Sequence, residues 1–150
     1  MGDVAGMVAL YAALRERRYP TMLVVHESVS ALAPDLLQHA ANETGASYVD
    51  FIHEATAGET QVVAGAFMRH HFLKWLKEQA RAKGGLWVEN ADAVIATWPE
   101  REQREFFMEF LKTESRSADG VAAPIVVASA LAGRFTLPEE PRGWGVVVRV

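Results

Sequence analysis

Short apolar segments separated by stretches of helical character constrain the fold of this chain most strongly. Thr21–Val25 (TMLVV) is apolar at every position after Thr21, and such a run is typical of a strand buried on both faces. Four further strands are expected at residues 46–52, 85–90, 124–130 and 143–150. Strands that alternate with helices form βαβ units around a parallel sheet. We therefore expect an α/β fold, a three-layer α/β/α domain with a mostly parallel five-stranded sheet.

Helical periodicity fills the gaps between these strands. A first helix is expected from a cap at Asp3 to an end before Pro20. A second helix begins near Pro34, which suits a first turn, and stops before Gly45. The apolar stripe of the first helix is Val4, Met7, Val8, Tyr11 and Leu14.

A longer helix is expected over residues 60–83, before Gly84. Three of its residues, Met68, His71 and Trp75, fall opposite its main apolar stripe. Because Met and aromatic side chains are enriched at protein contacts, these three form a candidate partner surface. The alternative is that the first helix packs over them inside the domain. The main stripe is Val62, Ala66, Leu73, Leu76 and Ala80.

The next helix is expected to begin at a capping box. Thr97 is the cap, and Glu100 reaches back to it three residues later. The helix it opens carries Phe106, Phe107, Phe110 and Leu111 within one arc.

Length, charge and composition argue against several classes of protein. At 150 residues the chain has the size of one domain. A net charge of −4 argues against a broad nucleic-acid footprint, so direct nucleic-acid binding is not expected. The chain contains no cysteine for a disulfide or a thiolate zinc site. No apolar run approaches the roughly 20 residues of a membrane span, and a cytoplasmic protein is expected.

The first strand leads into a segment with the length of a phosphate-binding loop. The pattern G-x-x-x-x-G-K-[ST] falls on residues 26–33. His26 and Ala31 replace its glycines, Leu32 its lysine and Ala33 its hydroxyl residue. In the layout of its elements the chain resembles the P-loop ATPases of the RecA/AAA+ branch, with a degenerate Walker A motif. No helical lid domain is expected.

The replaced residues argue against binding of a polyphosphate. A phosphate loop depends on glycines that turn backbone N–H groups inward and on a lysine that neutralises charge. Ala31 resists positive φ, Leu32 carries no charge, and Glu27 adds a negative one. We expect neither ATP hydrolysis nor a bound cofactor. The degenerate nucleotide site comprises His26, Glu27, Ser30, Ala31 and Leu32, with Glu89, Asn90 and Ser129 from later strands.

The third and fourth expected strands also resemble those of the P-loop ATPases. The segment GGLWVENAD resembles a Walker B strand, with Glu89 at the magnesium-acid position and Asn90 at that of the catalytic glutamate. An amide cannot serve as general base for the attacking water. Ser129 would be the polar tip of the following strand, which senses the γ-phosphate in that family. The family's order places the fourth strand between the first and the third.

The resemblance also implies a role for two arginines. In AAA+ rings an arginine finger between the sensor strand and the fifth strand reaches the neighbour's nucleotide, and Arg134 and Arg142 occupy that region. A pseudo-ATPase subunit could complete a neighbour's site in this way. The alternative is that both are solvated loop arginines. The leading helix and compact length also resemble the small P-loop protein of BREX-type phage-defence systems.

Two rival interpretations remain, a metal site and a pseudo-receiver domain. The pairs His26–Glu27 and His53–Glu54 both follow strands, and such groups can bind zinc or iron. With the RecA-like order their strands lie three positions apart, roughly 14 Å at about 4.8 Å per strand, too far for shared ligands. A pseudo-receiver domain is disfavoured by long crossovers and by the lack of a lysine after the fifth strand.

The expected function is that of a non-catalytic P-loop-like subunit or adaptor in a larger assembly, such as a phage-defence or DNA-handling complex. The expected partner is a protein, either an ATPase neighbour or further copies of the chain, and not a membrane. The alternative is a metal- or nucleotide-dependent hydrolase that uses His and Glu residues at the strand ends.

Overall fold

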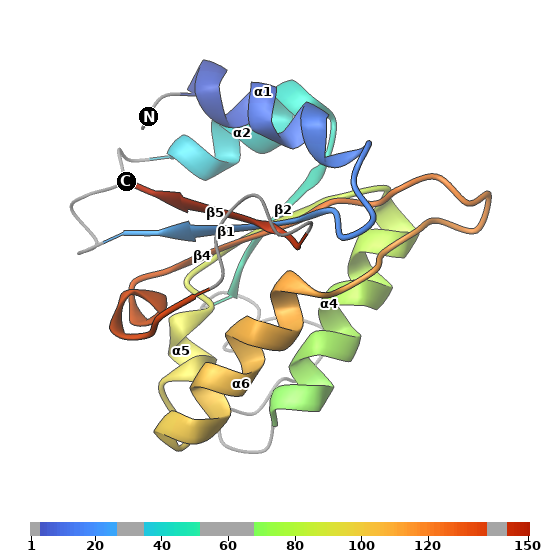
Figure 1. Ribbon diagram of the computed structural model, residues 1–150. Coiled ribbons are helices and arrows are strands. Elements are labelled where there is room, and N and C mark those ends of the chain that lie inside the picture. The colour runs from blue at the N-terminus through green and yellow to red at the C-terminus, as the bar shows by residue number, and fades with distance from the viewer. Residues whose placement is uncertain (1–3, 27–34, 52–67, 138–143) are drawn as a thin grey trace.

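The computed structural model describes residues 4–26, 35–51, 68–137 and 144–150 (Figure 1). Its strands are β1 (Thr21–Val25), β2 (Ser47–Asp50), β3 (Leu86–Glu89), β4 (Ile125–Ser129) and β5 (Val146–Arg149). Its helices are α1 (Val4–Leu14), α2 (Leu36–Thr44), α4 (Arg69–Lys83), α5 (Asp92–Ile95), α6 (Glu100–Leu111) and the 3-10 helix η2 (Leu131–Arg134). Each of the five expected strands and four expected helices has a counterpart among these elements, whereas α5 and η2 were not expected. The helix expected over residues 60–83 is interrupted, because Met68 is extended and α4 begins at Arg69; residues 60–67 lie outside the described residues.

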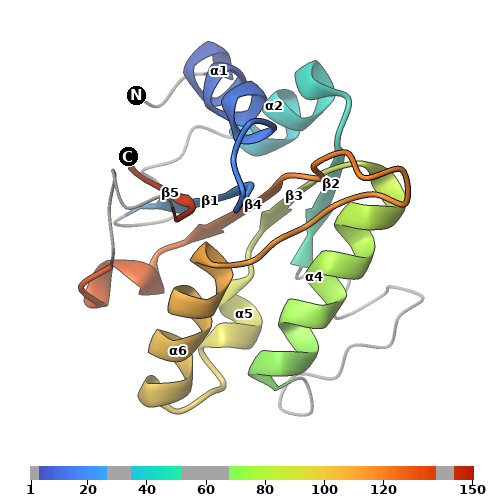
Figure 2. The same cartoon turned by 45° about the vertical axis from the view of Figure 1, so that its right-hand side comes forward.

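The strands form one parallel sheet in the order β2-β3-β4-β1-β5 (Figure 2). The fourth strand lies between the first and the third, and the first and second strands lie three positions apart. Both features of the expected order are confirmed. Among the described helices, none is both long enough and apolar enough to cross a membrane.

Alternate residues of the strands serve the two faces of the sheet. In β1, Met22 and Val24 pack toward α1 and α2, whereas Leu23 and Val25 pack toward α4, α5 and α6. All five residues of β1 are buried. This two-sided burial explains why the strand is apolar without alternation, and it produces the three layers seen in Figure 1.

A stacked pair of aromatic rings fixes α1 on the sheet. The ring centroids of Tyr11 in α1 and Trp87 in β3 lie 5.3 Å apart at an interplanar angle of 22°. Gly85 lies directly beneath the tyrosine hydroxyl at a φ of 153°, and a Cβ there would stand 1.9 Å from Tyr11 Oη. Glycine is therefore required at this position for both conformation and space.

Aromatic side chains fill the opposite layer, and Phe72 in α4 lies among them. Its ring centroid is 5.0 Å from that of Phe51, 5.3 Å from that of Phe106 and 6.1 Å from that of Trp98. These residues come from the end of β2, from α6 and from the segment before α6. The cluster therefore joins α4 and α6 to each other and to the sheet.

The buried face of α4 differs from the expected one. Phe72, Trp75, Leu76 and Ala80 are its buried residues, and Leu73 is only partly buried. Trp75 is 8% exposed and packs on Phe51, so it lies in the core and not on the expected partner surface. Nor does α1 cover it, because α1 lies on the other face of the sheet. Met68 and His71 are exposed.

The capping box expected before α6 does not form. The hydroxyl of Thr97 donates to the carbonyl of Val94 at 2.6 Å, and no side chain caps α6. Pro99 precedes the first helical residue, Glu100. Thr97 instead closes the short helix α5, a use of threonine that competes with capping.

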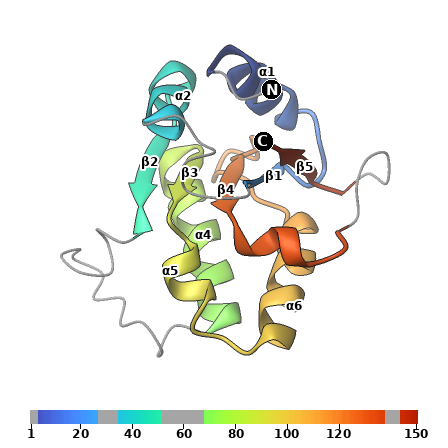
Figure 3. The same ribbon diagram turned by 90° about the vertical axis from the view of Figure 1, so that its left-hand side faces the viewer.

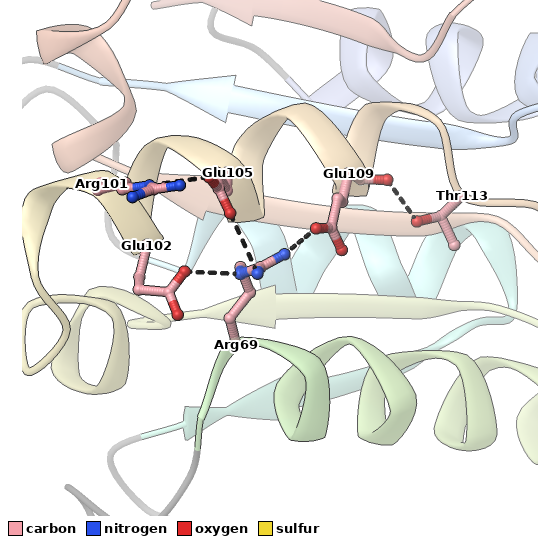
Figure 4. Close-up of polar contacts among 6 residues, drawn as sticks. All are labelled: Arg69, Arg101, Glu102, Glu105, Glu109 and Thr113. Carbon is pink, nitrogen blue, oxygen red and sulfur yellow. Dashed lines mark hydrogen bonds and ion pairs between the residues drawn. The ribbon is translucent and has the colours of Figure 1, made fainter.

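One guanidinium group links α4 to α6 (Figure 4). Arg69 Nε lies 3.1 Å from Glu102 Oε2, its Nη2 lies 3.1 Å from Glu105 Oε2, and its Nη1 contacts Glu109. The three carboxylates follow at spacings of three and four residues, so they share one face of α6. A cation at the first position of a helix is unfavourable to the helix dipole. The carboxylates of α6 offset that cost and fix the approach of the two helices.

We expect Arg69→Met to destabilise the protein by about 2 kcal/mol, because it leaves three neighbouring carboxylates without their shared cation. Denaturant unfolding would measure the loss, which should shrink at high salt. Arg101→Met is the matched control, since Arg101 contacts the same Glu105 from an 82% exposed side chain. The control should change the stability by no more than about 0.5 kcal/mol. Equal losses in the two variants would contradict this role of Arg69.

Candidate functional site

Polar side chains gather at the carboxyl edge of the sheet. In a parallel sheet the carboxyl ends of all strands meet at one edge, where α/β proteins place their sites. His26 follows β1, Asp50 ends β2, Glu89 and Asn90 close β3, and Ser129 ends β4. This edge is the candidate functional site.

Two hydrogen bonds join the ends of β2 and β3. Asp50 and Glu89 are register partners in the parallel pair. The hydroxyl of Tyr48 donates to Glu89 Oε1, and Asn90 Nδ2 donates to Asp50 Oδ1 at 3.0 Å. Asn90 adopts a left-handed conformation with φ of 62°, which asparagine tolerates better than most residues. Both residues expected at the Walker B positions are thus bound to β2.

The environment of Tyr48 favours its neutral form. Burial raises the pKa of its hydroxyl above the ordinary value of 10.0. The hydrogen bond to Glu89 and the charges of Glu89, Asp50 and Asp35 raise this pKa further. Tyr48 therefore remains a hydrogen-bond donor to Glu89 far above neutral pH.

The end of β4 is held by Asp92, at the start of α5. Ser129 Oγ donates to Asp92 Oδ1 at 2.6 Å, and the backbone N–H of Ala130 donates to Asp92 Oδ2 at 2.7 Å. Leu131 N–H lies 3.3 Å from the same oxygen. Ser129 Oγ also accepts from the backbone N–H of Ala132 at 3.2 Å. The hydroxyl expected to act as a sensor is thus buried and used to fix the first turn of η2.

Asp92 was not found from the sequence. It lies 37 residues from Ser129 along the chain, so no local pattern joins them. The signal that was available is its place in a short polar segment after the third strand, ENAD, of which only Glu89 and Asn90 were interpreted.

His26 continues the backbone ladder at the end of β1. Its N–H donates to the carbonyl of Ser129 at 3.3 Å, so the two residues end neighbouring strands. Within the part of the chain that the structure describes, no group of three or more His, Cys, Asp or Glu residues could hold a metal ion. Other expected site residues lie outside the described residues, namely Glu27, Ser30, Ala31, Leu32, His53, Glu54 and Arg142.

Arg134 ends η2 and is exposed. It lines a pocket of about 600 Å³ together with residues of the first turns of α6, and Figure 3 shows η2 beside that helix. Sequence reasoning singled out Arg134 and missed the two arginines of α6 that share the pocket. The lining residues are Glu100, Arg101, Arg104, Arg134, Phe135 and Thr136.

We expect Asp92→Ala to destabilise the protein by about 2–3 kcal/mol, because Ser129 and the N–H groups that start η2 lose a charged acceptor. Thermal or denaturant unfolding would measure this effect. Asp119→Ala is the control, since Asp119 is exposed and bonds to groups of its own turn, the hydroxyl of Ser117 and nearby backbone N–H groups. A stability of Asp92→Ala equal to that of the control would rule out the structural role of Asp92.

The raised pKa of Tyr48 predicts its alkaline behaviour. The pKa of Tyr48 is higher in the folded protein than the ordinary value of 10.0 that it has in the unfolded chain. Its contribution to stability is therefore complete below pH 10 and is lost as the pH rises toward the pKa of the folded protein. The unfolding free energy should therefore fall above pH 10, and less steeply in Tyr48→Phe. The protein has three tyrosines. When the folded wild type and the folded Tyr48→Phe variant are titrated around pH 10, the increase in tyrosinate absorbance should be the same in both. A drop in this amplitude for Tyr48→Phe would show that Tyr48 ionises normally.

Comparison with known proteins adds no family to this description. A scan of the sequence against models of protein families gave no match, and a search of curated proteins found no significant relative.

Proposed function

We propose that this chain is a non-catalytic, P-loop-like α/β domain that serves as a subunit or adaptor in a larger protein assembly. A phage-defence or DNA-handling complex is the class of assembly that its resemblances suggest. The proposal is supported above all by the carboxyl edge of the sheet. A nucleotide hydrolase needs the side chains at these strand ends to contact the nucleotide, magnesium or the attacking water. In this chain Glu89, Asn90 and Ser129 are hydrogen-bonded to other residues of the domain.

The chemistry of these positions supports the absence of hydrolysis. Asn90 cannot accept a proton from water as a carboxylate can, and its amide donates to Asp50. Glu89 accepts from Tyr48, and the hydroxyl of Ser129 is bound to Asp92. None of these groups could turn toward a γ-phosphate without breaking its present hydrogen bond.

The negative charge of the carboxyl edge also argues against nucleotide binding. Asp50, Glu89 and Asp92 bring three carboxylates to the ends of β2, β3 and α5. A polyphosphate placed among them would be repelled, because like charges at short range are costly in a partly buried site.

An adaptor of this kind acts through its surface. Arg134 is exposed on η2, directly after β4. By the resemblance to AAA+ proteins, one of two candidates, Arg134 or Arg142, is proposed to act as an arginine finger toward the nucleotide site of a neighbouring ATPase. The proposed partner is therefore a protein that itself binds nucleotide.

We expect calorimetry with ATP and magnesium to show no binding, and phosphate-release assays to show no turnover, for the reasons of charge and side-chain occupancy given above. Micromolar binding of ATP would overturn the proposal. Turnover that is lost in Glu89→Ala would establish the alternative, a divergent nucleotide hydrolase. Tyr48→Phe is the matched control, since it alters the partner of Glu89 and keeps the carboxylate.

A further inference from the structure

The charged side chains of α6 are segregated. Glu102, Glu105 and Glu109 face α4, where they surround the guanidinium of Arg69. Arg101 and Arg104 open instead onto the pocket beside η2. The two arginines of α6 thus line a pocket that the three carboxylates do not line, although Arg101 also reaches Glu105.

Arg134 adds a third guanidinium to this pocket, and Glu100 is the one carboxylate among its lining residues. Arg101 pairs with Glu105 at 3.3 Å, but its side chain is 82% exposed. Neither Arg104 nor Arg134 forms an ion pair with another residue in the described ranges. The pocket is therefore a cationic hollow on a chain whose net charge is −4.

We infer that this pocket, lined by Arg101, Arg104 and Arg134, binds an acidic segment of a partner protein. Guanidinium groups bind carboxylates in a planar, two-pronged geometry, and several around one hollow favour a ligand with more than one negative charge. The inference rests on the proposed function, because it assigns the surface through which the adaptor recognises its partner.

Three observations favour an acidic peptide over a nucleic acid. Phe135 is partly buried in the same wall, so it can pack on an apolar side chain next to the carboxylates. The three arginines line a single pocket, whereas a nucleic-acid backbone requires contacts with many successive phosphates. The negative net charge of the chain would further weaken the approach of a long polyanion.

The test is fluorescence anisotropy at low salt with a labelled peptide in which a short run of glutamates precedes a leucine. The wild-type protein should bind this peptide and should not bind the version with glutamine in place of glutamate. The double variant Arg104→Glu, Arg134→Glu should bind at least about tenfold more weakly, as expected for loss of charged hydrogen bonds. Circular dichroism would verify that it is folded.

The matched control is Lys77→Glu with Arg81→Glu, which makes the same change in net charge on the exposed side of α4. This control should keep nearly the wild-type affinity. Equal weakening in the two double variants, no binding by the wild type, or tighter binding of a single-stranded oligonucleotide or of pyrophosphate would each overturn the inference. ATP binding in the calorimetric experiment would overturn the adaptor proposal without changing the peptide result, so the two failures are distinguishable.

Discussion

The aromatic cluster beneath the sheet is the interaction on which the arrangement of this protein depends. Phe72 contacts Phe51, Trp98 and Phe106, and so joins α4 to the end of β2, to the segment before α6 and to α6 itself. Aromatic pairs of this kind contribute beyond the area that they bury. Because the cluster sets the position of α6, it also sets where the arginines of that helix meet η2.

Carboxylates gather at the carboxyl edge of the sheet, whereas three arginines line the pocket beside η2. The carboxyl edge of the sheet collects Asp50, Glu89 and Asp92, each of which accepts a hydrogen bond from its own domain. The arginines lie across η2, where they face solvent. Tyr48, whose pKa is raised, donates a hydrogen bond to one of these carboxylates, that of Glu89. In the proposals made above, the edge excludes anions and the pocket receives an acidic ligand.

The fold could be predicted further than the site. A strand buried on both faces has no position for a solvent-facing polar residue, so an uninterrupted apolar run such as the one in Thr21–Val25 predicts a strand. The order of the strands followed from the resemblance, since no local pattern encodes which strands pair. Trp75 was misplaced because a helical stripe read without its neighbours can be rotated by one position, and here its centre is Phe72 instead of Leu73. Asp92 and the arginines of α6 were missed because their roles arise only when distant segments meet.

The place of β1 in the sheet also has a consequence for biosynthesis. Its two neighbours are β4 and β5, so Thr21 must wait for Ile125, about a hundred residues later, before its strand has any hydrogen-bonding partner. Until then this strand, which is apolar at every position after Thr21, has neither of its neighbours to pair with. Such topologies are slow to form and vulnerable to aggregation, so a nascent chain of this kind would benefit from a chaperone during most of its translation.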